Sequence, residues 1–214
     1  MKIIIFGAGE HGAQTFHILR QLPDYELVGF VDDDPQKHGA DYCGRKVLGG
    51  QAILPDLRKQ GVEGGIVAIG DNYRRSDFTR KLIQHGFQII NAIHPQALID
   101  DTAVLGKGLI IEMGVMVHPL AKIGDCVFLG GSSVVSHHSV VEENALIGGG
   151  VVFGGNVHVG RNTLVGVGAV LQPHISIGSD VVVGIGAAVI SDLPDNVVAV
   201  GVPAKIIRKN VVAR

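Results

Sequence analysis

The sequence is poor in cysteine and in aromatic residues. Its 214 residues include two cysteines, no tryptophan and 5% aromatic residues, with a formal net charge of −2. The cysteines, Cys43 and Cys126, do not have the spacing of a metal site, and we expect both to be reduced and buried. A net charge this close to zero gives no indication of a nucleic-acid partner.

Long apolar runs are absent as well. No stretch of about twenty apolar residues occurs, so we expect no membrane span. The first residues, MKIIIFGAG, carry a charge followed by an apolar run. This run is too short for the core of a signal peptide and leads directly into a glycine-rich turn. We therefore expect a β-strand here and a cytoplasmic protein.

Glycine, in contrast, is plentiful, with 31 residues. The second half of the chain also has an apolar side chain at every sixth position. One such period buries too little apolar surface alone and must stack on its neighbours, so the repeat predicts a solenoid. The sixteen positions are Ile99, Leu105, Ile111, Val117, Ile123, Leu129, Val135, Val141, Ile147, Phe153, Val159, Val165, Leu171, Ile177, Val183 and Val189.

Each period suits a short strand and a tight turn, and three such sides close a triangular coil of eighteen residues. The fifteen complete periods from Ile99 to Ala188 predict five coils, which make a prism roughly 24 Å long at the usual strand spacing. This stretch, with the closing GVPAK segment from Gly201 to Lys205, resembles the parallel β-helix of the hexapeptide-repeat acyltransferases. The resemblance implies a left-handed coil.

The first part of the chain carries a glycine turn, GAGEHG, between a predicted strand at Lys2–Phe6 and a helix. A second strand, Glu26–Val31, ends on acidic residues. Together these make the dinucleotide fingerprint, which by itself suggests NAD. The region is, however, close in size to one mononucleotide-binding half, so a single nucleotide fits better. Its other predicted elements are a helix near Gln51–Gln60, a strand Gly65–Ile69, a helix Asn72–His85 and a strand Phe87–Ala92.

The glycine turn is suited to phosphate, because backbone N–H groups at a helix N-terminus attract anions. The acid pair Asp32 and Asp33 can accept hydrogen bonds from a ribose or a base. Gly70, after the third main strand, is a weaker second contact. The alternative is that the glycines of the turn serve only tight packing.

A small glycine-turn α/β unit followed directly by a hexapeptide helix is the arrangement of bacterial sugar acetyltransferases. These include the nucleotide-sugar N-acetyltransferases of bacillosamine and perosamine synthesis and the sialic acid O-acetyltransferase-like proteins. The resemblance implies a Rossmann-like nucleotide-sugar-binding domain at residues 1–97. It also implies a left-handed β-helix acyltransferase domain, with a C-terminal tail, at residues 98–214. The substrate-binding residues that it implies are Gly9, Glu10, His11, Asp32, Asp33 and Gly70.

Acetyl transfer needs a base and donors for the oxyanion of the tetrahedral intermediate. His137, in the turn VSHHSV, aligns with the family's base, a His followed by Glu or Asp; the alternative is a solvated turn histidine. Here His138 replaces the acid, so Glu142 or Glu143 substitutes, or His138 relays the proton, or activity is reduced. Gly155, eighteen residues after His137, should stack directly beneath it and is the candidate oxyanion donor.

The resemblance further implies acetyl-CoA as co-substrate, no metal, and a homotrimer with acetyl-CoA between two prisms. The CoA groove that it implies contains Leu146, Val167 and Ile185, although a His and a Gly common in relatives are missing at the first and last. No residues interrupt the register, so no loop grows out to cover a site, and a cleft requires a neighbouring prism. The implied reaction is direct acetyl transfer to the amine of a nucleotide-linked amino sugar.

Other functions stay open at this point. One is O-acetylation of sialic acid or another sugar, because the same base serves a hydroxyl, and another is a non-catalytic trimeric scaffold. The γ-class carbonic anhydrases share the helix fold and bind zinc through three histidines. His138 and His174 are two coils apart as that site requires, but the third ligand would be Ser179. The sugar, the nucleotide and the pathway are not identified by the sequence.

Overall fold

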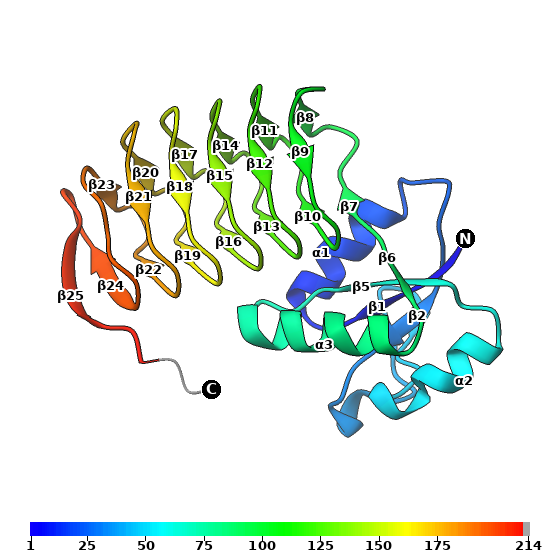
Figure 1. Ribbon diagram of the computed structural model, residues 1–214. Coiled ribbons are helices and arrows are strands. Elements are labelled where there is room, and N and C mark those ends of the chain that lie inside the picture. Colours follow the sequence, from blue (N-terminus) through cyan, green and yellow to red (C-terminus); the bar gives the residue numbers. More distant parts are fainter. Residues whose placement is uncertain (212–214) are drawn as a thin grey trace. The chain divides into compact units, whose positions relative to one another are not determined.

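The computed structural model describes residues 1–211 and divides the chain into two compact units (Figure 1). The first unit is Met1–Pro95 and the second begins at Gln96. Among the helices of residues 1–211, none combines the length and apolar character that crossing a membrane requires.

The first unit is built on a four-stranded parallel sheet in the order β2-β1-β5-β6. Helix α1 packs against β1, and α3 packs against β5 and β6. The sheet strands are β1 (Lys2–Phe6), β2 (Glu26–Val31), β5 (Gly64–Val67) and β6 (Gln88–Ile89). The α-helices are α1 (Glu10–Leu19), α2 (Leu54–Lys59) and α3 (Asn72–Gln84), with short 3₁₀ turns at Pro35–Lys37 and Gln51–Ile53, and β7 (Ala92–Ile93) follows.

Strand β1 is the centre of this unit's core. Its residues Ile3–Phe6 are almost fully buried, which is typical of a parallel strand covered on both faces. Phe6 packs with Val67, Leu82 and other buried side chains in one cluster. The carboxyl end of β1 leads into the glycine turn, so this core fixes where the turn begins.

A hairpin that the sequence analysis did not predict lies between β2 and α2. Strands β3 (Asp41–Tyr42) and β4 (Arg45–Lys46) pair antiparallel. The two residues that join them, Cys43 and Gly44, have φ of 50° and 73°, which is the conformation that two-residue hairpins require. Cys43 is half-buried, contrary to expectation, because it sits in this turn; Cys126 is buried, and both are free thiols.

The second unit is a stack of triangular coils with three parallel faces (Figure 1). The first face carries β8 (Leu98–Ile99), β11 (Met116–Val117), β14 (Val134–Val135), β17 (Val152–Phe153), β20 (Val170–Leu171) and β23 (Ala188–Val189). The second face carries β9 (Val104–Leu105), β12 (Lys122–Ile123), β15 (Val140–Val141), β18 (His158–Val159) and β21 (Ser176–Ile177). The third face carries β10 (Ile110–Ile111), β13 (Phe128–Leu129), β16 (Leu146–Ile147), β19 (Leu164–Val165), β22 (Val182–Val183), β24 (Val197–Val200) and the antiparallel β25 (Lys205–Lys209).

The pairing register has the predicted period of eighteen residues. Met116 pairs with Val134 on the first face and Phe128 with Leu146 on the third. In strands β10 to β23 the second residue points inward and is buried; Val135 and Ile147, for example, are fully inaccessible. The stack is longer than the five coils expected, because the first face already holds six strands and β24 extends the third face beyond the last apolar period.

Candidate functional site

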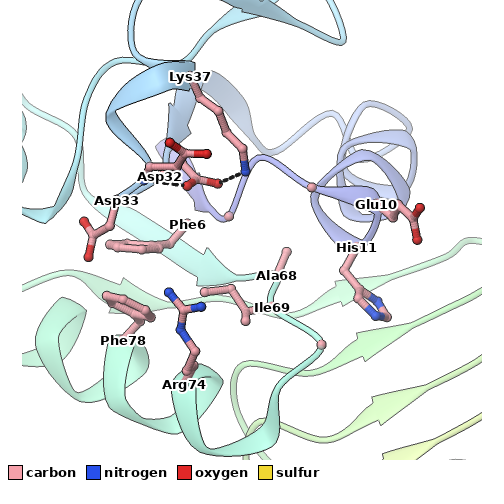
Figure 2. A pocket seen from close by; sticks show the side chains of 14 residues that line it. Phe6, Glu10, His11, Asp32, Asp33, Lys37, Ala68, Ile69, Arg74 and Phe78 are labelled. Carbon is pink, nitrogen blue, oxygen red and sulfur yellow. Dashed lines mark hydrogen bonds and ion pairs between the residues drawn. The ribbon is translucent and has the colours of Figure 1, made fainter.

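A pocket of about 620 Å³ lies at the carboxyl ends of β1, β2 and β5 (Figure 2). This is the edge of a parallel sheet at which α/β proteins bind their ligands. The pocket brings together all six residues that the sequence analysis assigned to the substrate: Gly9, Glu10, His11, Asp32, Asp33 and Gly70.

The glycines of the turn have different functions. Gly7 has a φ of 115°, and a Cβ on Gly12 would lie 2.1 Å from the Gly7 carbonyl oxygen, so both positions exclude a side chain. A Cβ on Gly9 would meet nothing within 4 Å. Gly9 is also the N-cap of α1 and supplies no side-chain cap, whereas the first N–H groups of a helix lack intrahelical partners. Tight packing therefore explains Gly7 and Gly12, and Gly9 leaves room for an anion to approach.

Asp32 ties the glycine turn to the loop after β2. Its Oδ2 accepts hydrogen bonds from Ala8 N–H at 2.8 Å and from Lys37 Nζ at 2.9 Å, and its Oδ1 accepts one from Asp34 N–H at 3.0 Å. Desolvation on burial raises the pKa of Asp32, but these donors outweigh it and leave the pKa lowered. Asp32 is thus an ionised brace within the chain.

Asp33 is also engaged within the chain, with more acceptor capacity left over. Its Oδ1 accepts from Gln51 N–H at 2.7 Å and its Oδ2 from Gln51 Nε2 at 2.8 Å. Each carboxylate oxygen can accept two hydrogen bonds, so one position on each oxygen of Asp33 is not used by these contacts. Of the two predicted acids, Asp33 is the better placed to accept from a ligand.

Cationic and aromatic side chains complete the pocket, and these were not predicted from the sequence. Lys37 bonds Asp32 through one of its three donors. The Arg74 guanidinium lies 5.9 Å from the Phe78 ring centroid, and Phe78 stacks on Phe6 at 4.2 Å. Figure 2 shows Lys37 and Arg74 on opposite sides of the pocket. Only the positions of Lys37 and Arg74, which follow the ends of predicted strands, could have indicated from the sequence that they line the pocket.

A further layer of contacts holds the pocket walls. The Tyr42 hydroxyl donates to the Gly9 carbonyl at 2.8 Å, and burial raises the pKa of this phenol, which keeps it a donor. Arg75, 1% exposed, donates to the carbonyls of Ile69 at 3.0 Å and Gly70 at 3.4 Å. A Cβ on Gly70 would lie 2.9 Å from His11 Nε2, so the imidazole packs directly against this wall.

In the second unit, His137 and Gly155 are stacked as the coil period predicted. Both are first residues of turns between the first and second faces, and we call this edge the histidine corner (residues 137–138, 155–156 and 173–174). A Cβ on Gly155 would lie 2.5 Å from His137 Cε1 and 2.6 Å from Nε2, so the imidazole covers the glycine. Asn156 N–H donates to the His137 carbonyl at 3.0 Å, which joins the two turns.

The Gly155 N–H takes no part in the ladder of backbone hydrogen bonds among the described residues. At some other turns the equivalent N–H binds a carboxylate: Gly131 N–H donates to Glu112 at 2.7 Å and Ser179 N–H to Asp195 at 2.8 Å. Within residues 1–211, the N–H of Gly155 has no hydrogen-bond acceptor. This position of the turn therefore suits a negatively charged oxygen, and at Gly155 it is available to a ligand.

The partner of His137 is His138 and not a carboxylate. Their Nδ1 atoms lie 3.1 Å apart. Glu142 instead contacts His158 Nε2 at 3.0 Å and Arg161 N–H at 3.1 Å. Glu143 lies 4.0 Å from Arg161. Of the replacements considered for the missing acid, the structure brings only His138 into contact with His137.

The predicted CoA residues lie on other parts of the prism. Val167 and Ile185 are 60% and 80% exposed and occupy adjacent turns between the third and first faces, where Gly186 N–H donates to the Val167 carbonyl at 2.8 Å. Leu146 lies on the third face beside Leu164. The structure thus brings Val167 and Ile185 together at one edge of the first face, with the histidine corner at the other edge. In residues 1–211, no three His, Cys, Asp or Glu side chains converge as metal ligands.

The Asp32 brace has a testable consequence for stability. Asp32→Asn removes an acceptor and the charge that Lys37 faces, so we expect the free energy of unfolding to fall by about 1–3 kcal/mol at pH 7. Folding lowers the pKa of Asp32 from 3.8, so its contribution is complete above that value and is lost as the pH falls through the folded-state value. Urea unfolding should show a constant difference between pH 7 and 5 that shrinks below about pH 4.

The control is Asp41→Asn, which breaks an exposed ion pair with Lys46 of the same length, 2.9 Å. We expect this change to alter stability by less than about 1 kcal/mol at every pH. An Asp32→Asn protein as stable as the wild type at pH 7 would contradict the assigned role.

Comparison with known proteins relates both units to described families. Residues 2–82 match the PglD N-terminal domain, and residues 138–173 match the bacterial transferase hexapeptide (six repeats). GDP-perosamine N-acetyltransferase of Escherichia coli O157:H7 is 34% identical over 121 residues, which are 53% of this chain and 52% of that protein. The chain therefore spans about half the length of this curated relative.

Solved structures match over nearly the whole chain. A GDP-perosamine N-acetyltransferase of Caulobacter crescentus, solved as a histidine-to-alanine mutant with CoA and GDP-perosamine, has a TM-score of 0.93 at 36% identity, and the match covers 98% of each chain. The acetyltransferase domain of PglB from Neisseria gonorrhoeae, solved with acetyl coenzyme A, has a TM-score of 0.89 at 28% identity and matches over 96% of this chain and 98% of that one.

These matches confirm the predicted fold class, a small Rossmann-like α/β domain followed by a left-handed parallel β-helix. The similarity to the Caulobacter structure is above 30% identity and extends over 98% of that chain. The chain belongs to the hexapeptide-repeat sugar acetyltransferase family.

Proposed function

We propose that the chain is an acetyl-CoA-dependent N-acetyltransferase whose acceptor is the amine of a nucleotide-linked amino sugar. The observation that carries the proposal is the pair His137 and Gly155, in which the imidazole lies against the glycine and the Gly155 N–H has no acceptor among the described residues. A base and an oxyanion donor within one turn of each other are what acyl transfer to an amine requires.

In the proposed reaction the acceptor amine attacks the thioester carbonyl of acetyl-CoA directly. The new C–N bond forms as His137 Nε2 takes a proton from the amine. The Gly155 N–H stabilises the negative oxygen of the tetrahedral intermediate. The intermediate collapses to the amide and expels the CoA thiolate, and His137 transfers the proton taken from the amine to this sulfur. No acyl-enzyme is invoked, since Cys126 is buried and Cys43 lies in the hairpin of the first unit.

His138 fixes the tautomer of the base in this scheme. His137 can accept a proton at Nε2 only if its hydrogen is on Nδ1, and the 3.1 Å contact gives that hydrogen an acceptor in His138 Nδ1. When His137 becomes an imidazolium, the same bond to the neutral His138 orients it. His138 therefore performs the orienting function of the family's acid without supplying a negative charge.

The nucleotide sugar is assigned to the pocket of the first unit. The uncapped N-terminus of α1 at Gly9 suits a diphosphate, and Lys37 and Arg74 add two cationic side chains. The names of the two GDP-perosamine N-acetyltransferases reported above refer to a nucleotide-linked sugar, which supports this assignment. Since the reaction consumes acetyl-CoA, we assign it to the cytoplasm.

The direct test is a substrate screen with acetyl-CoA in which the released thiol is measured. Nucleotide-linked 4-amino sugars should release thiol at least tenfold faster than the corresponding free amino sugars, because only the former fill the pocket at Gly9. Faster turnover of hydroxyl acceptors would replace the proposal with O-acetylation. Absence of thiol release with every acceptor would indicate a non-catalytic protein.

With the best acceptor from this screen, His137→Ala tests the base. Because a positioned base contributes typically 10² to 10⁴-fold, kcat should fall by roughly that factor while both KM values change little. His138→Ala should lower kcat by a smaller factor than His137→Ala does. His138→Asn keeps an acceptor near Nδ1 of His137, so its kcat should lie between those of His138→Ala and the wild type. His174→Ala, one coil beyond Gly155 at the same corner, is the control and should keep full activity.

We further propose a homotrimer that completes the acetyl-CoA site. The outward side chains of the first face are all apolar, and Leu98, Met116, Val152 and Val170 are between 36% and 67% exposed. A continuous apolar face of this kind usually marks an interface. Since Val167 and His137 lie on the two edges of this face, a second prism packed on it would bring one subunit's CoA residues toward another's base.

Val170→Asp places a charge in the middle of this face and should convert the trimer to monomers, as measured by light scattering after size exclusion. Loss of thiol release should accompany the change, because the cleft is incomplete in the monomer. Val104→Asp alters an outward residue of the second face that is 59% exposed and should leave the trimer intact. An active Val170→Asp monomer would exclude an intersubunit site.

A further inference from the structure

The residue after the histidine pair, Ser139, is fully buried and bonds both ends of the turn beneath it. Its Oγ lies 3.4 Å from the Gly154 carbonyl oxygen, to which the hydroxyl donates, and accepts from Val157 N–H at 3.2 Å. These two residues flank Gly155 and Asn156. The hydroxyl therefore joins the turn that carries the base to the turn that carries the candidate oxyanion donor.

The contact acts on the peptide unit that contains the donor. The Gly154 carbonyl and the Gly155 N–H belong to one planar trans peptide, so fixing the direction of the oxygen fixes the direction of the N–H. Donation to the oxygen also polarises the peptide, and chains of hydrogen bonds strengthen one another in a low-dielectric environment. An oxyanion bound to Gly155 N–H would draw on this chain, and bonds that are long in a free enzyme commonly shorten in the complex.

We propose that Ser139 is a positioning residue that orients the Gly155 N–H toward the oxyanion. The inference rests on the proposed function, which makes Gly155 the oxyanion donor. Ser139 does not touch the substrate in this scheme. It acts through the Gly154–Gly155 peptide, and its loss should impair turnover more than binding.

The chain contains a matched control at another edge of the prism. Thr163 is also fully buried, donates to the Gly178 carbonyl at 2.7 Å and accepts from Val181 N–H at 3.1 Å. This is the same bridge between successive coils, but the turn that it spans, at Ser179, carries no histidine base. Removing the Thr163 hydroxyl measures the structural cost of losing such a bridge without altering the histidine corner.

The equivalent positions of other periods indicate which substitutions will fold. Thr fills this place at Thr163, so Ser139→Thr keeps a hydroxyl in a shape that the prism accepts. Ser139→Ala removes the hydroxyl and introduces a side chain that the same place already holds in five other periods: Ala103, Ala121, Ala145, Ala169 and Ala187. Both variants should therefore form the β-helix.

The test compares kcat, both KM values and the melting temperature of Ser139→Ala, Ser139→Thr and Thr163→Val. Loss of one oriented hydrogen bond predicts that Ser139→Ala lowers kcat roughly 3- to 10-fold, with KM values within about twofold. Ser139→Thr should retain wild-type kcat, and Thr163→Val should lower the melting temperature as much as Ser139→Ala without reducing kcat.

His137→Ala, assayed alongside, separates the inference from the function on which it rests. If His137→Ala loses activity while Ser139→Ala keeps the wild-type kcat, the positioning role is wrong and the proposed function stands. Equal falls in kcat for Ser139→Ala and Thr163→Val would also overturn it, because the effect would then be general to the prism. Full activity of His137→Ala would overturn the proposed function and this inference together.

Discussion

The inward apolar side chain at every sixth residue is the constraint on which the second unit depends. Each strand must lie on the strand eighteen residues earlier to bury that side chain, so the turns of successive coils are forced into columns. The contact of His137 with Gly155 follows from this register and not from any local attraction between the two residues. A core built for stability thus fixes the turns that carry the candidate site, and rigid support of this kind favours the precise geometry that catalysis needs.

The first unit reaches a similar precision through polar contacts. Close packing of Gly12 on Gly7 brings α1 down onto the end of β1, and the Asp32 carboxylate holds the turn at Ala8 against the loop after β2. The result is a helix N-terminus fixed in position and left without a side-chain cap. The acid in the fingerprint position organises the pocket here, and the groups available to a ligand are the turn itself, Asp33 and the cations around it.

Features written as local patterns could be predicted from the sequence. The spacing of apolar residues is enough to predict the coil period and the stacking of Gly155 under His137. Short apolar runs predict the strands Lys2–Phe6 and Glu26–Val31. Contacts between irregular segments could not be predicted, because no period relates their members. Three contacts are of this kind. They are the hydrogen bond from Tyr42 in the hairpin, the bond from Lys37 to Asp32, and the contact between Glu142 and His158.

The exchange of the family's acid for a histidine bears on where the transition state is stabilised. His138 has a φ of 57°, a conformation in which Asn, Asp and His are enriched among residues with a side chain, so the turn itself admits either an acid or a histidine. A histidine can orient His137, but unlike a carboxylate it supplies no negative charge to offset the positive charge that His137 acquires in the proposed reaction. In the proposed reaction more of the stabilisation must then come from the oxyanion side, where the Gly155 N–H is the proposed donor. Ser139 links the two sides of this proposed site, because it follows the histidine pair in sequence and its hydroxyl bonds the Gly154–Gly155 peptide.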